Sequence, residues 1–314
     1  MTRIFLTRDN MFKEIPDPED GCGISMVRPD EKEINTLAGR YEIDPDLLRA
    51  ALDTDERSRI ETDDNCTMIL VNIPTVKEHD EKELYDTIPL SVLITKETVI
   101  TVCLEDTPVL RPFAEGRVKG FFTNMKTRFI FQILYRTASL YLQDLRIIDK
   151  KSDMVENQLH RSTQNRELIE LLKLEKSLVY FTTALRSNEA VLEKLLKTDS
   201  VKKYPEDNEL LEDTIVENKQ AIEMANIYSG ILSGMMDAFA SVISNNLNIV
   251  MKVLAVVTIV LSVPTLIFSA YGMNVNVSGM PFAQSQWGFW IIVVLSLALS
   301  AGVAILFAKS NRFK

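Results

Sequence analysis

A line of small, mostly polar side chains runs along the last third of the chain, at alternating steps of four and three residues. Its hydroxyl, amide and carboxylate groups carry oxygen atoms that accept hydrogen bonds from the water around a cation. Steps of four and three place side chains on one face of a helix, and a seven-residue repeat is typical of helices that supercoil around one another. We call this line the polar stripe. It consists of Asp237, Ser241, Ser244, Asn248, Met251, Ala255, Thr258, Ser262, Thr265, Ser269 and Gly272.

The polar stripe has two explanations, and the sequence leaves both open. Small hydroxyl residues let membrane helices pack closely, with each hydroxyl bonded to its own backbone. Alternatively, identical helices surround an axis, and the polar stripe lines a narrow wet path for ions. The neighbouring line, from Met236 to Leu261 in the same steps, is wholly apolar. Asp237 and Asn248 favour the path, because they continue the stripe beyond the apolar segment with oxygen atoms that suit a cation and its waters.

Two apolar segments are candidates for membrane spans, and the outer part of the polar stripe lies in the first of them. Residues 253–271 and 288–308 contain no Lys, Arg, Asp, Glu, Asn, Gln or His. Each is long enough to cross a bilayer, which takes about 20 helical residues. Trp287 and Trp290 lie at the start of the second segment, where aromatic rings favour the membrane interface. We therefore expect a pore-lining membrane helix over the first segment and a second membrane helix over the other.

Basic residues flank the two segments on one side only. Lys252 precedes the first segment and three basic residues lie within 309–314, whereas residues 272–287 between the segments carry no charge. Basic residues stay on the cytoplasmic side of a membrane. We therefore expect a multi-pass protein of the cell membrane with both termini cytoplasmic, an outer loop over 272–287 and a basic cytoplasmic tail over 309–314.

The outer loop offers a cation neutral amides in place of carboxylates. Asn274 lies just after the first apolar segment, and no Asp or Glu follows Asp237. Mg²⁺ holds its water tightly and usually keeps several waters when a protein binds it. Conduction requires binding that is weak enough for the ion to leave, and an amide oxygen accepts hydrogen bonds from those waters without a full charge. Asn274 is therefore the candidate residue at the outer mouth.

The front of the chain has the composition of an acidic, water-soluble body. Of the 35 basic residues four lie at or after Lys252, whereas all 44 acidic residues lie at or before Asp237. This balance argues against nucleic acid as a partner, because neutralising phosphates requires a basic surface. The three cysteines are far apart and neither histidine has a ligand-spaced neighbour, so we expect free thiols and no zinc centre.

Residues 1–122 are predicted to form a cytoplasmic α/β domain. Asp44, just before Pro45, is the expected N-cap of one of its helices. The order of its strands is not predictable from these patterns. Strands are expected at 3–7, 24–29, 67–74, 88–95 and 98–104, and helices at 30–41 and 44–53.

Residues 123–204 are predicted to form two long antiparallel helices, because the hydrophobic pattern is helical and contains no proline. We expect them at 123–159 and 166–197, joined by a polar turn at 160–165.

A third helix is predicted to open at Pro205, with Glu206 and Asp207 favourably placed near its positive end. We expect it to form a stalk over 205–252 and to continue through the membrane to Tyr271. A helix of this length is not stable alone, so it requires partners along its length.

The first apolar segment ends in the motif YGMN, at Tyr271, Gly272, Met273 and Asn274. With the long helix before it and two carboxy-terminal spans, this motif resembles the CorA family of magnesium channels, and the resemblance covers the whole plan of the chain. It implies a homopentameric funnel in which Gly272, Met273 and Asn274 form the selectivity filter. It also implies pore-facing or constricting positions for Asp237, Asn248, Met251, Leu254 and Thr265. We expect metal contacts at Asn274, Asn248 and Asp237.

The resemblance further implies that Mg²⁺ bound between protomers holds the channel closed. The site would join a carboxylate on the stalk, matched by Asp213, to acidic residues on a helix of the front domain. In the predicted helix at 44–53, Arg49 and Ala50 stand where those acids are expected. The remaining candidates in this region are Asp46, Asp53 and Asp55.

We therefore expect a magnesium channel and not an enzyme, with Mg²⁺ both transported and regulatory. A related transporter of zinc, cobalt or nickel is the near alternative, because Phe282 and Ala283 follow Met280 and Pro281 where family members usually carry an acidic residue. The distant alternative is a membrane-anchored oligomeric scaffold in which the hydroxyl residues serve packing. The expected partners are further copies of the chain, the lipid bilayer and divalent cations.

Overall fold

The computed structural model describes residues 1–8, 11–79, 82–159, 165–197, 201, 204–283 and 285–309. The chain divides into two compact units, Met1–Met236 and Asp237–Lys314, and the boundary falls inside helix α6 (Pro205–Tyr271). The finer division into seven segments, from 1–122 to 309–314, remains a prediction.

The first unit is built around one seven-stranded mixed sheet, in the order β2-β1-β3-β7-β6-β5-β4. β3 and β7 are parallel, whereas the other neighbouring strands are antiparallel. The strands are β1 (Thr2–Arg8), β2 (Met11–Glu14), β3 (Gly23–Val27), β4 (Arg59–Thr62), β5 (Cys66–His79), β6 (Lys82–Thr95) and β7 (Val99–Cys103).

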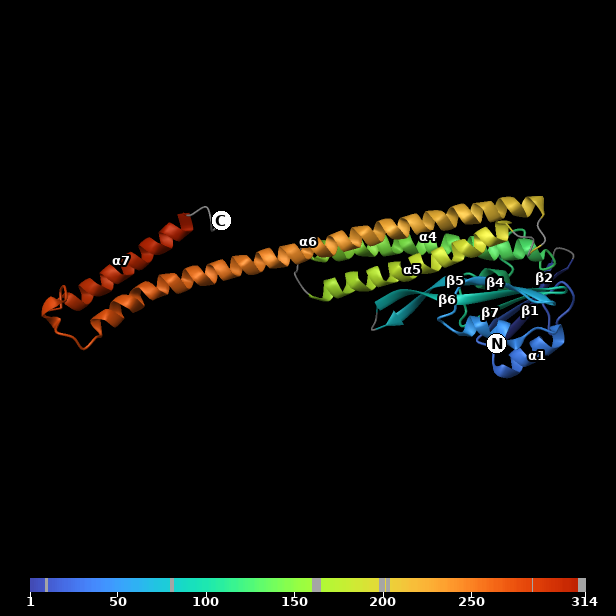
Figure 1. Cartoon of the computed structure of the whole chain (residues 1–314), viewed down its shortest axis with the longest axis horizontal. Coiled ribbons are helices and arrows are strands. Elements are labelled where there is room, and N and C mark those ends of the chain that lie inside the picture. Colours follow the sequence, from blue (N-terminus) through green and yellow to red (C-terminus); the bar gives the residue numbers. More distant parts are fainter. Residues whose placement is uncertain are drawn as a thin grey trace. The chain divides into compact units, whose positions relative to one another are not determined.

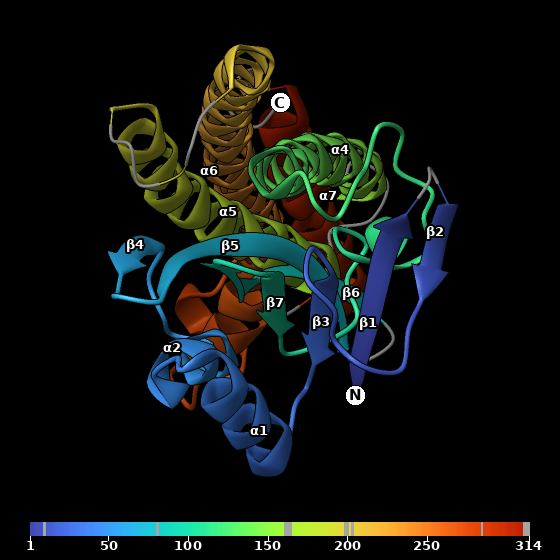
Figure 2. The ribbon, with the colours of Figure 1, turned by 90° about the vertical axis from the view of Figure 1, so that its right-hand side faces the viewer.

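Helices cover both faces of this sheet (Figure 1). In the end-on view, α1 and α2 lie on one face, and α4 and α5 lie on the other (Figure 2). The unit is therefore a three-layered α/β domain. Its helices are α1 (Glu31–Tyr41), α2 (Pro45–Arg49), η1 (Ala50–Leu52), α3 (Arg111–Ala114), α4 (Lys126–Leu159), α5 (Asn165–Lys197) and the first part of α6.

Side chains of β5 point alternately to the two faces of the sheet, so this strand contributes to the hydrophobic core on each face. Ile69, Val71 and Ile73 are fully buried in the hydrophobic core shared with α4 and α5. Met68 and Leu70 are buried in the second core, which the sheet shares with α1 and α2. Successive side chains of a strand point to opposite faces, so a run that is apolar at every position produces a strand covered on both sides.

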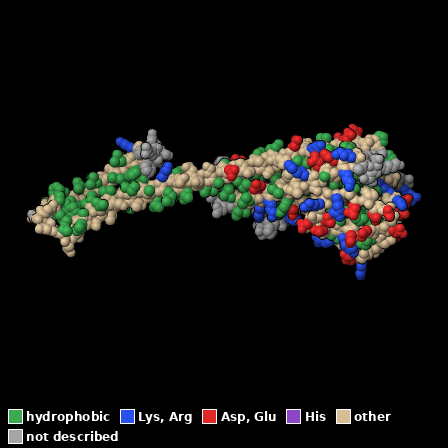
Figure 3. Space-filling view, in the orientation of Figure 1, with side chains coloured by type: hydrophobic (Ala, Val, Ile, Leu, Met, Phe, Trp, Pro, Cys, Tyr) green, Lys and Arg blue, Asp and Glu red, His purple; other side chains and the backbone are tan. Residues whose placement is uncertain are grey.

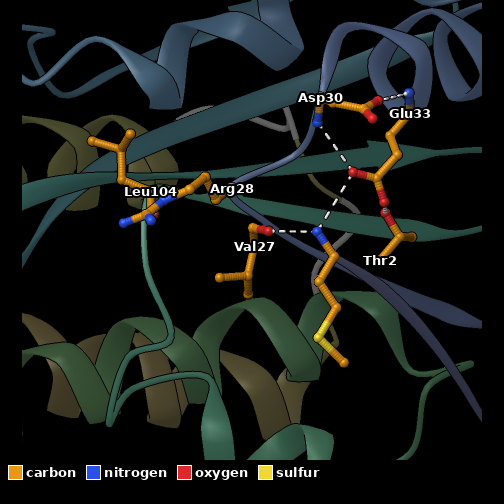
Figure 4. A network of polar contacts seen from close by, with 7 residues as sticks. Thr2, Val27, Arg28, Asp30, Glu33 and Leu104 are labelled. Carbon is orange, nitrogen blue, oxygen red and sulfur yellow. Dashed lines mark hydrogen bonds and ion pairs between the residues drawn. The ribbon is translucent and has the colours of Figure 1, made fainter.

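The start of α1 is fixed by a reciprocal capping box (Figure 4). The Asp30 carboxylate accepts a hydrogen bond from the Glu33 backbone N–H at 2.8 Å, and Glu33 accepts one from the Asp30 N–H at 3.1 Å. Thr2 on β1 donates to the other Glu33 oxygen at 2.7 Å. This cap therefore satisfies helix N–H groups that would otherwise lack partners, and through Thr2 it joins α1 to the start of β1.

All five predicted strands are present, but the structure adds β2 and β4. β4 lies within the run of charged residues at 53–64, where no strand was predicted. Its Ile60 is buried, whereas Glu61 and Thr62 are exposed, so only one apolar side chain of this edge strand reaches the core. The predicted N-cap is confirmed, because the Asp44 side chain accepts a hydrogen bond from the Asp46 N–H at 3.0 Å.

The two long predicted helices correspond to α4 and α5, with one correction. α4 begins at Lys126, not at Thr123, because Thr123 is fully buried in the preceding segment and its hydroxyl accepts a hydrogen bond from the Thr7 N–H at 2.9 Å. The polar turn predicted at 160–165 lies outside the described residues except for Asn165, where α5 begins.

Asn188 on α5 completes the hydrogen bonding of β5 beyond the end of β4. β4 pairs with β5 only as far as Arg59 opposite Leu70, so the backbone of Asn72 lies past the last paired residue. The Asn188 side chain accepts from the Asn72 N–H at 2.9 Å and donates to the Asn72 carbonyl at 2.7 Å. Asn188 is 3% exposed, so this amide replaces a missing strand partner inside the domain.

The second unit consists of the rest of α6, the short helix η2 (Val277–Gly279) and α7 (Gly288–Lys309). Both α6 and α7 contain a stretch that is long and apolar enough to cross a membrane. In the space-filling view hydrophobic side chains gather over this unit, whereas charged side chains gather over the first unit (Figure 3). Both predicted membrane segments therefore lie on helices, and the basic tail beyond Lys309 lies outside the described residues.

Candidate functional site

The polar stripe lies on one side of α6, apart from Gly272 in the turn that follows, and every member is exposed in the single chain. Its outer part borders a continuous surface groove of about 670 Å³. Thr258, Ser262, Thr265 and Ser269 line this groove together with Met273 of the YGMN motif. The structure therefore places the outer stripe and the motif along one surface.

α7 packs on the opposite side of α6. The Ser300 hydroxyl donates to the Val260 carbonyl at 2.8 Å, which marks the side of α6 that α7 contacts. Thr258 and Ser262 are each two residues from Val260, and two residues of an α-helix correspond to a rotation of about 200°. The stripe therefore faces away from α7, so packing against the chain's own second span does not account for it.

Three hydroxyls in the apolar segment 253–271 donate to backbone carbonyls four residues earlier. Thr258 donates to Leu254 at 2.8 Å, Ser262 to Thr258 at 2.7 Å and Thr265 to Leu261 at 2.9 Å. These bonds satisfy the hydroxyl protons without a partner helix and leave the oxygen lone pairs free to accept. A hydrated cation presents water protons outward, so a row of such acceptors suits its water shell.

The cytoplasmic half of the predicted path is also uncovered in the single chain. Asp237, Ser241, Ser244, Asn248 and Ala255 are exposed along α6. Met251 is 57% exposed and Leu254 is 58% exposed, although Leu254 lies on the apolar line beside the stripe. In the single chain, therefore, both the polar stripe and the apolar line beside it are exposed.

The YGMN motif forms the end of α6 and the turn that follows. α6 ends at Tyr271, and the Gly272 N–H closes the last turn by donating to the Phe268 carbonyl at 2.9 Å. Met273 is 58% exposed and Asn274 is exposed in the loop. The Tyr271 hydroxyl donates to the Pro281 carbonyl at 2.7 Å, so the end of α6 is tied to the far side of the loop that follows it.

Gly288 brings the outer loop against the start of α7. A Cβ at Gly288 would lie 2.2 Å from the Phe282 carbonyl oxygen, so no larger residue fits there without a shift of the backbone. Phe282 itself has a positive φ of 60°, a conformation that side-chain-bearing residues rarely adopt. An apolar cavity of about 730 Å³ lies beneath this contact, lined by Phe268, Tyr271, Phe289 and Ile292 among others.

The candidate regulatory residues do not meet within one chain. Asp213 on α6 borders a hollow of about 380 Å³ with Arg128 and Arg136, on the side of the sheet that α4 covers. Asp46 and Asp53 belong to the α2 and η1 region on the other face. Among the residues that the structure describes, no three His, Cys, Asp or Glu side chains are grouped to hold a metal ion.

The α2 carboxylates are already engaged in local contacts. Asp46 pairs with Arg49 at 2.8 Å, and Arg49 also contacts Glu31 at 2.8 Å. The hydrogen bond from Arg49 lowers the pKa of Glu31, so this carboxylate stays ionised beside the guanidinium. Asp53 accepts a hydrogen bond from the Asp55 N–H at 3.0 Å. Arg49 therefore neutralises the charge around Asp46, whereas Asp53 forms no ion pair with a cation among the residues that the structure describes.

Sequence reasoning missed the contact between Ser300 and Val260. Two signals point toward it: Pro264 stands inside the first apolar segment, and Ser296 and Ser300 are four residues apart in the second. A proline leaves the carbonyl four residues earlier without its helical donor, and serines four apart share one helix face. The pairing of the two helices is a tertiary contact, which these local signals do not specify.

The sequence model of the family described as CorA-like Mg²⁺ transporter protein matches residues 24–309. The cobalt/magnesium transport protein CorA of Methanocaldococcus jannaschii is 26% identical over 297 residues, which cover 92% of this chain and 90% of that relative. The cobalt/magnesium transport protein CorA of Thermotoga maritima is 22% identical over 277 residues, covering 86% of this chain and 77% of the relative.

The chain is also similar to the complete structure of the CorA magnesium transporter from Methanocaldococcus jannaschii. The TM-score is 0.83 at 23% sequence identity, and the match covers 99% of this chain and 98% of that chain. At this level of identity the likeness shows a shared fold. The predicted plan of an α/β domain, a long helix and two carboxy-terminal apolar helices is thereby confirmed.

Proposed function

This chain belongs to the family of CorA-like Mg²⁺ transporters, and from that membership we propose that it forms a channel for potential-driven uptake of Mg²⁺ across the cell membrane. Members of this family are transporters or channels, so the chain is not an enzyme. The observation that carries the proposal is the polar stripe, which lies on the face of α6 opposite α7 and continues outward to the YGMN turn.

A pore along this stripe requires several copies of the chain, because two spans cannot enclose a conduit. The proposed assembly is a homopentamer with a cytoplasmic funnel, in which the α6 helices surround the axis and both termini are cytoplasmic. The uncovered polar stripe would face the axis, and the exposed apolar line through Leu254, Val257 and Leu261 would pack against the next copy. Burial of these apolar side chains would supply contacts that one chain lacks.

The proposed path begins at a ring of Asn274 side chains and follows the stripe inward. Gly272, Met273 and Asn274 form the filter, where amide oxygens accept hydrogen bonds from the waters of Mg²⁺. The hydroxyls of Thr265, Ser262 and Thr258 continue these acceptors, followed by Asn248 and an exit at Asp237. The membrane potential contributes about 2.3 kcal/mol per charge per 100 mV, and roughly twice that for a divalent ion.

Closure is proposed to depend on internal Mg²⁺ bound between subunits. Asp213 and the candidates Asp46 and Asp53 lie on opposite faces of the sheet in one chain, so a site that joins them has to combine neighbouring chains. Bound Mg²⁺ would bridge these acidic groups, and its loss would let the carboxylates of adjacent subunits repel one another. Asp53 is the stronger partner for Asp213, because Arg49 pairs with Asp46.

The transported ion is proposed to be Mg²⁺, with Co²⁺ as a second substrate, since two relatives are named cobalt/magnesium transport proteins. The described part of the outer loop contains no carboxylate, so nothing there concentrates cations by charge. Selection then depends on the amide ring and on the water shell of the ion. Transport of Ni²⁺ or Zn²⁺ by the same architecture remains the alternative.

Flux into liposomes tests this function. The purified full-length chain is reconstituted with a trapped magnesium indicator, and uptake is recorded with and without an inside-negative potential. We expect uptake that the potential accelerates and that Co²⁺ inhibits by competition. Uptake of Zn²⁺ or Ni²⁺ without Mg²⁺ would replace the proposed substrate, and no flux of any of the four ions would contradict the channel.

A further inference from the structure

One backbone carbonyl in the pore-facing helix is satisfied from the other span. Pro264 stands inside α6 and has no N–H, so the carbonyl of Val260, four residues earlier, lacks its usual helical donor. The Ser300 hydroxyl of α7 donates to this carbonyl at 2.8 Å. An unsatisfied carbonyl is costly where no water is available, so this bond supplies the group that the proline removes.

The bond between Ser300 and Val260 lies within the part of α6 that carries the polar stripe, so it can influence the stripe as well as the packing of the two helices. Ser262 lies between Val260 and Pro264, and Thr265 and Ser269 follow toward the YGMN turn. The proline ring also clashes with the carbonyl four residues earlier, so a helix bends at such a site. The donor that bonds to the Val260 carbonyl therefore determines the direction of the helix axis after Pro264. This direction places Thr265 and Ser269 relative to the inner residues of the polar stripe.

The face of α7 that carries Ser300 is built for close approach. Gly288, Ile292, Ser296 and Ser300 are its buried residues and recur at steps of four. Small side chains at such spacing let membrane helices approach closely. Ser296 is 0% exposed, and its hydroxyl has no hydrogen-bond partner in the described part of the chain. Ser296 and Ser300 therefore have the same side chain, are both buried and lie on the same face of α7. They differ because only the Ser300 hydroxyl, among the described residues, bonds to α6.

We propose that Ser300 is a positioning residue of the ion path: its hydroxyl replaces the donor lost at Pro264 and thereby fixes the direction of α6 from Ser262 to its end at Tyr271, just before Asn274. This inference rests on the proposed function, because it assigns a role in transport through the polar stripe. Ser300 does not contact the ion; it acts through the backbone of Val260.

Four variants test this role in the full-length chain. Ser300→Ala removes the bond, Ser300→Thr retains a hydroxyl, and Ser296→Ala removes a hydroxyl from the same face that makes no bond. Pro264→Ala restores an N–H four residues after Val260, so α6 can satisfy the carbonyl itself. Each variant, and the double variant Pro264→Ala with Ser300→Ala, is reconstituted, and initial Mg²⁺ and Co²⁺ uptake is normalised to correctly assembled protein.

We expect Ser300→Ala to slow Mg²⁺ uptake by about threefold, which corresponds to an average hydrogen bond between membrane helices. Ser300→Thr should restore the rate, and Ser296→Ala should match the parent. In the Pro264→Ala background, Ser300→Ala should have no further effect. A change in the ratio of Mg²⁺ to Co²⁺ uptake should accompany the slower rate, since a purely structural loss would lower the amount of assembled protein and leave this ratio unchanged.

Two results would overturn the positioning role: an equal effect of Ser300→Ala in both backgrounds, or an equal effect of Ser296→Ala and Ser300→Ala. If Ser300→Ala does not assemble, the double variant decides, because the proposal requires it to assemble and transport like Pro264→Ala alone. Failure of the proposed function is a separate outcome, since the parent chain itself would then take up no divalent ion.

Discussion

The Ser262 hydroxyl donates to the backbone carbonyl of Thr258 at 2.7 Å, on the side of α6 that α7 leaves uncovered. Two members of the polar stripe are therefore linked one turn apart without help from any other helix. Because the proton is used within the helix, the oxygen stays available as an acceptor. This arrangement supports a row of weak water-binding positions along the proposed path.

Bulky apolar side chains on the stripe should block transport. We expect Ser262→Leu and Thr258→Leu each to abolish Mg²⁺ uptake, because leucine fills the path and offers no acceptor. Ser262→Ala should keep the path open and reduce uptake only mildly. Stopped-flow uptake into liposomes measures all three. Normal uptake by both leucine variants would instead favour a scaffold in which these residues serve packing.

Removal of the stalk carboxylate should weaken closure by internal Mg²⁺. We expect Asp213→Asn to raise the internal Mg²⁺ concentration required for half-inhibition by about fivefold or more, which is the lower range of allosteric couplings. Glu209→Gln is the matched control, one turn earlier on the same helix and in the same hollow. Uptake recorded at graded internal Mg²⁺ gives the inhibition curve. Equal curves for Asp213→Asn and the parent would remove Asp213 from the sensor.

The amide of Asn188 should be important for the stability of the first unit. We expect Asn188→Ala to lower its free energy of unfolding by about 1–3 kcal/mol, because the partly buried Asn72 N–H would lose its acceptor and the Asn72 carbonyl would keep only the Tyr141 hydroxyl as a donor among the described residues. Asn157→Ala is the control, since that amide is exposed and, within the described part of the chain, donates to the Asp153 carbonyl of its own helix. Thermal unfolding of the full-length protein in detergent compares the two. An equal midpoint for both variants would show that the amide contact adds nothing.

The cysteines of the first unit should be inert in the folded protein. All three are buried, and burial raises the pKa of the Cys66 and Cys103 thiols to about 11. At pH 7.5 these two groups stay protonated, so the thiolate needed for alkylation is scarce. We expect negligible maleimide labelling of the folded chain by mass spectrometry and full labelling after denaturation. Rapid labelling before denaturation would show that this core opens.

The sequence predicted the elements whose signals are local. The polar stripe, both apolar segments and the N-cap at Asp44 depend on spacing and composition along a few turns, and the structure has helices or caps at each. Strands were predicted at 67–74 and 88–95 for a similar reason, because these apolar runs are bounded by polar residues, but β5 and β6 are each 14 residues long and extend beyond the predicted runs. Motif and position together were enough to indicate the family.

The remaining features depend on contacts between distant residues. β2 and β4 are short edge strands with few buried side chains, so their sequences resemble loops. The local sequence predicts Thr123 as part of a helix, whereas in the structure its hydroxyl accepts a hydrogen bond from the Thr7 N–H before the helix begins. The contact of Ser300 with Val260 joins residues 40 positions apart, and only the fold brings them together. The sensor candidates Asp213, Asp46 and Asp53 do not meet within one chain, so the sequence could not pair them, and the site proposed for them joins neighbouring chains.

The filter variant Asn274→Ala gives the most direct test of the account. Potential-driven Mg²⁺ uptake is measured for the parent chain, for Asn274→Ala and for Asn276→Ala, whose amide oxygen accepts a local hydrogen bond from the Ser278 N–H at 3.1 Å. The account predicts that uptake is lost in Asn274→Ala and retained in Asn276→Ala. Unchanged uptake in assembled Asn274→Ala would contradict a pore whose filter lies at the end of α6.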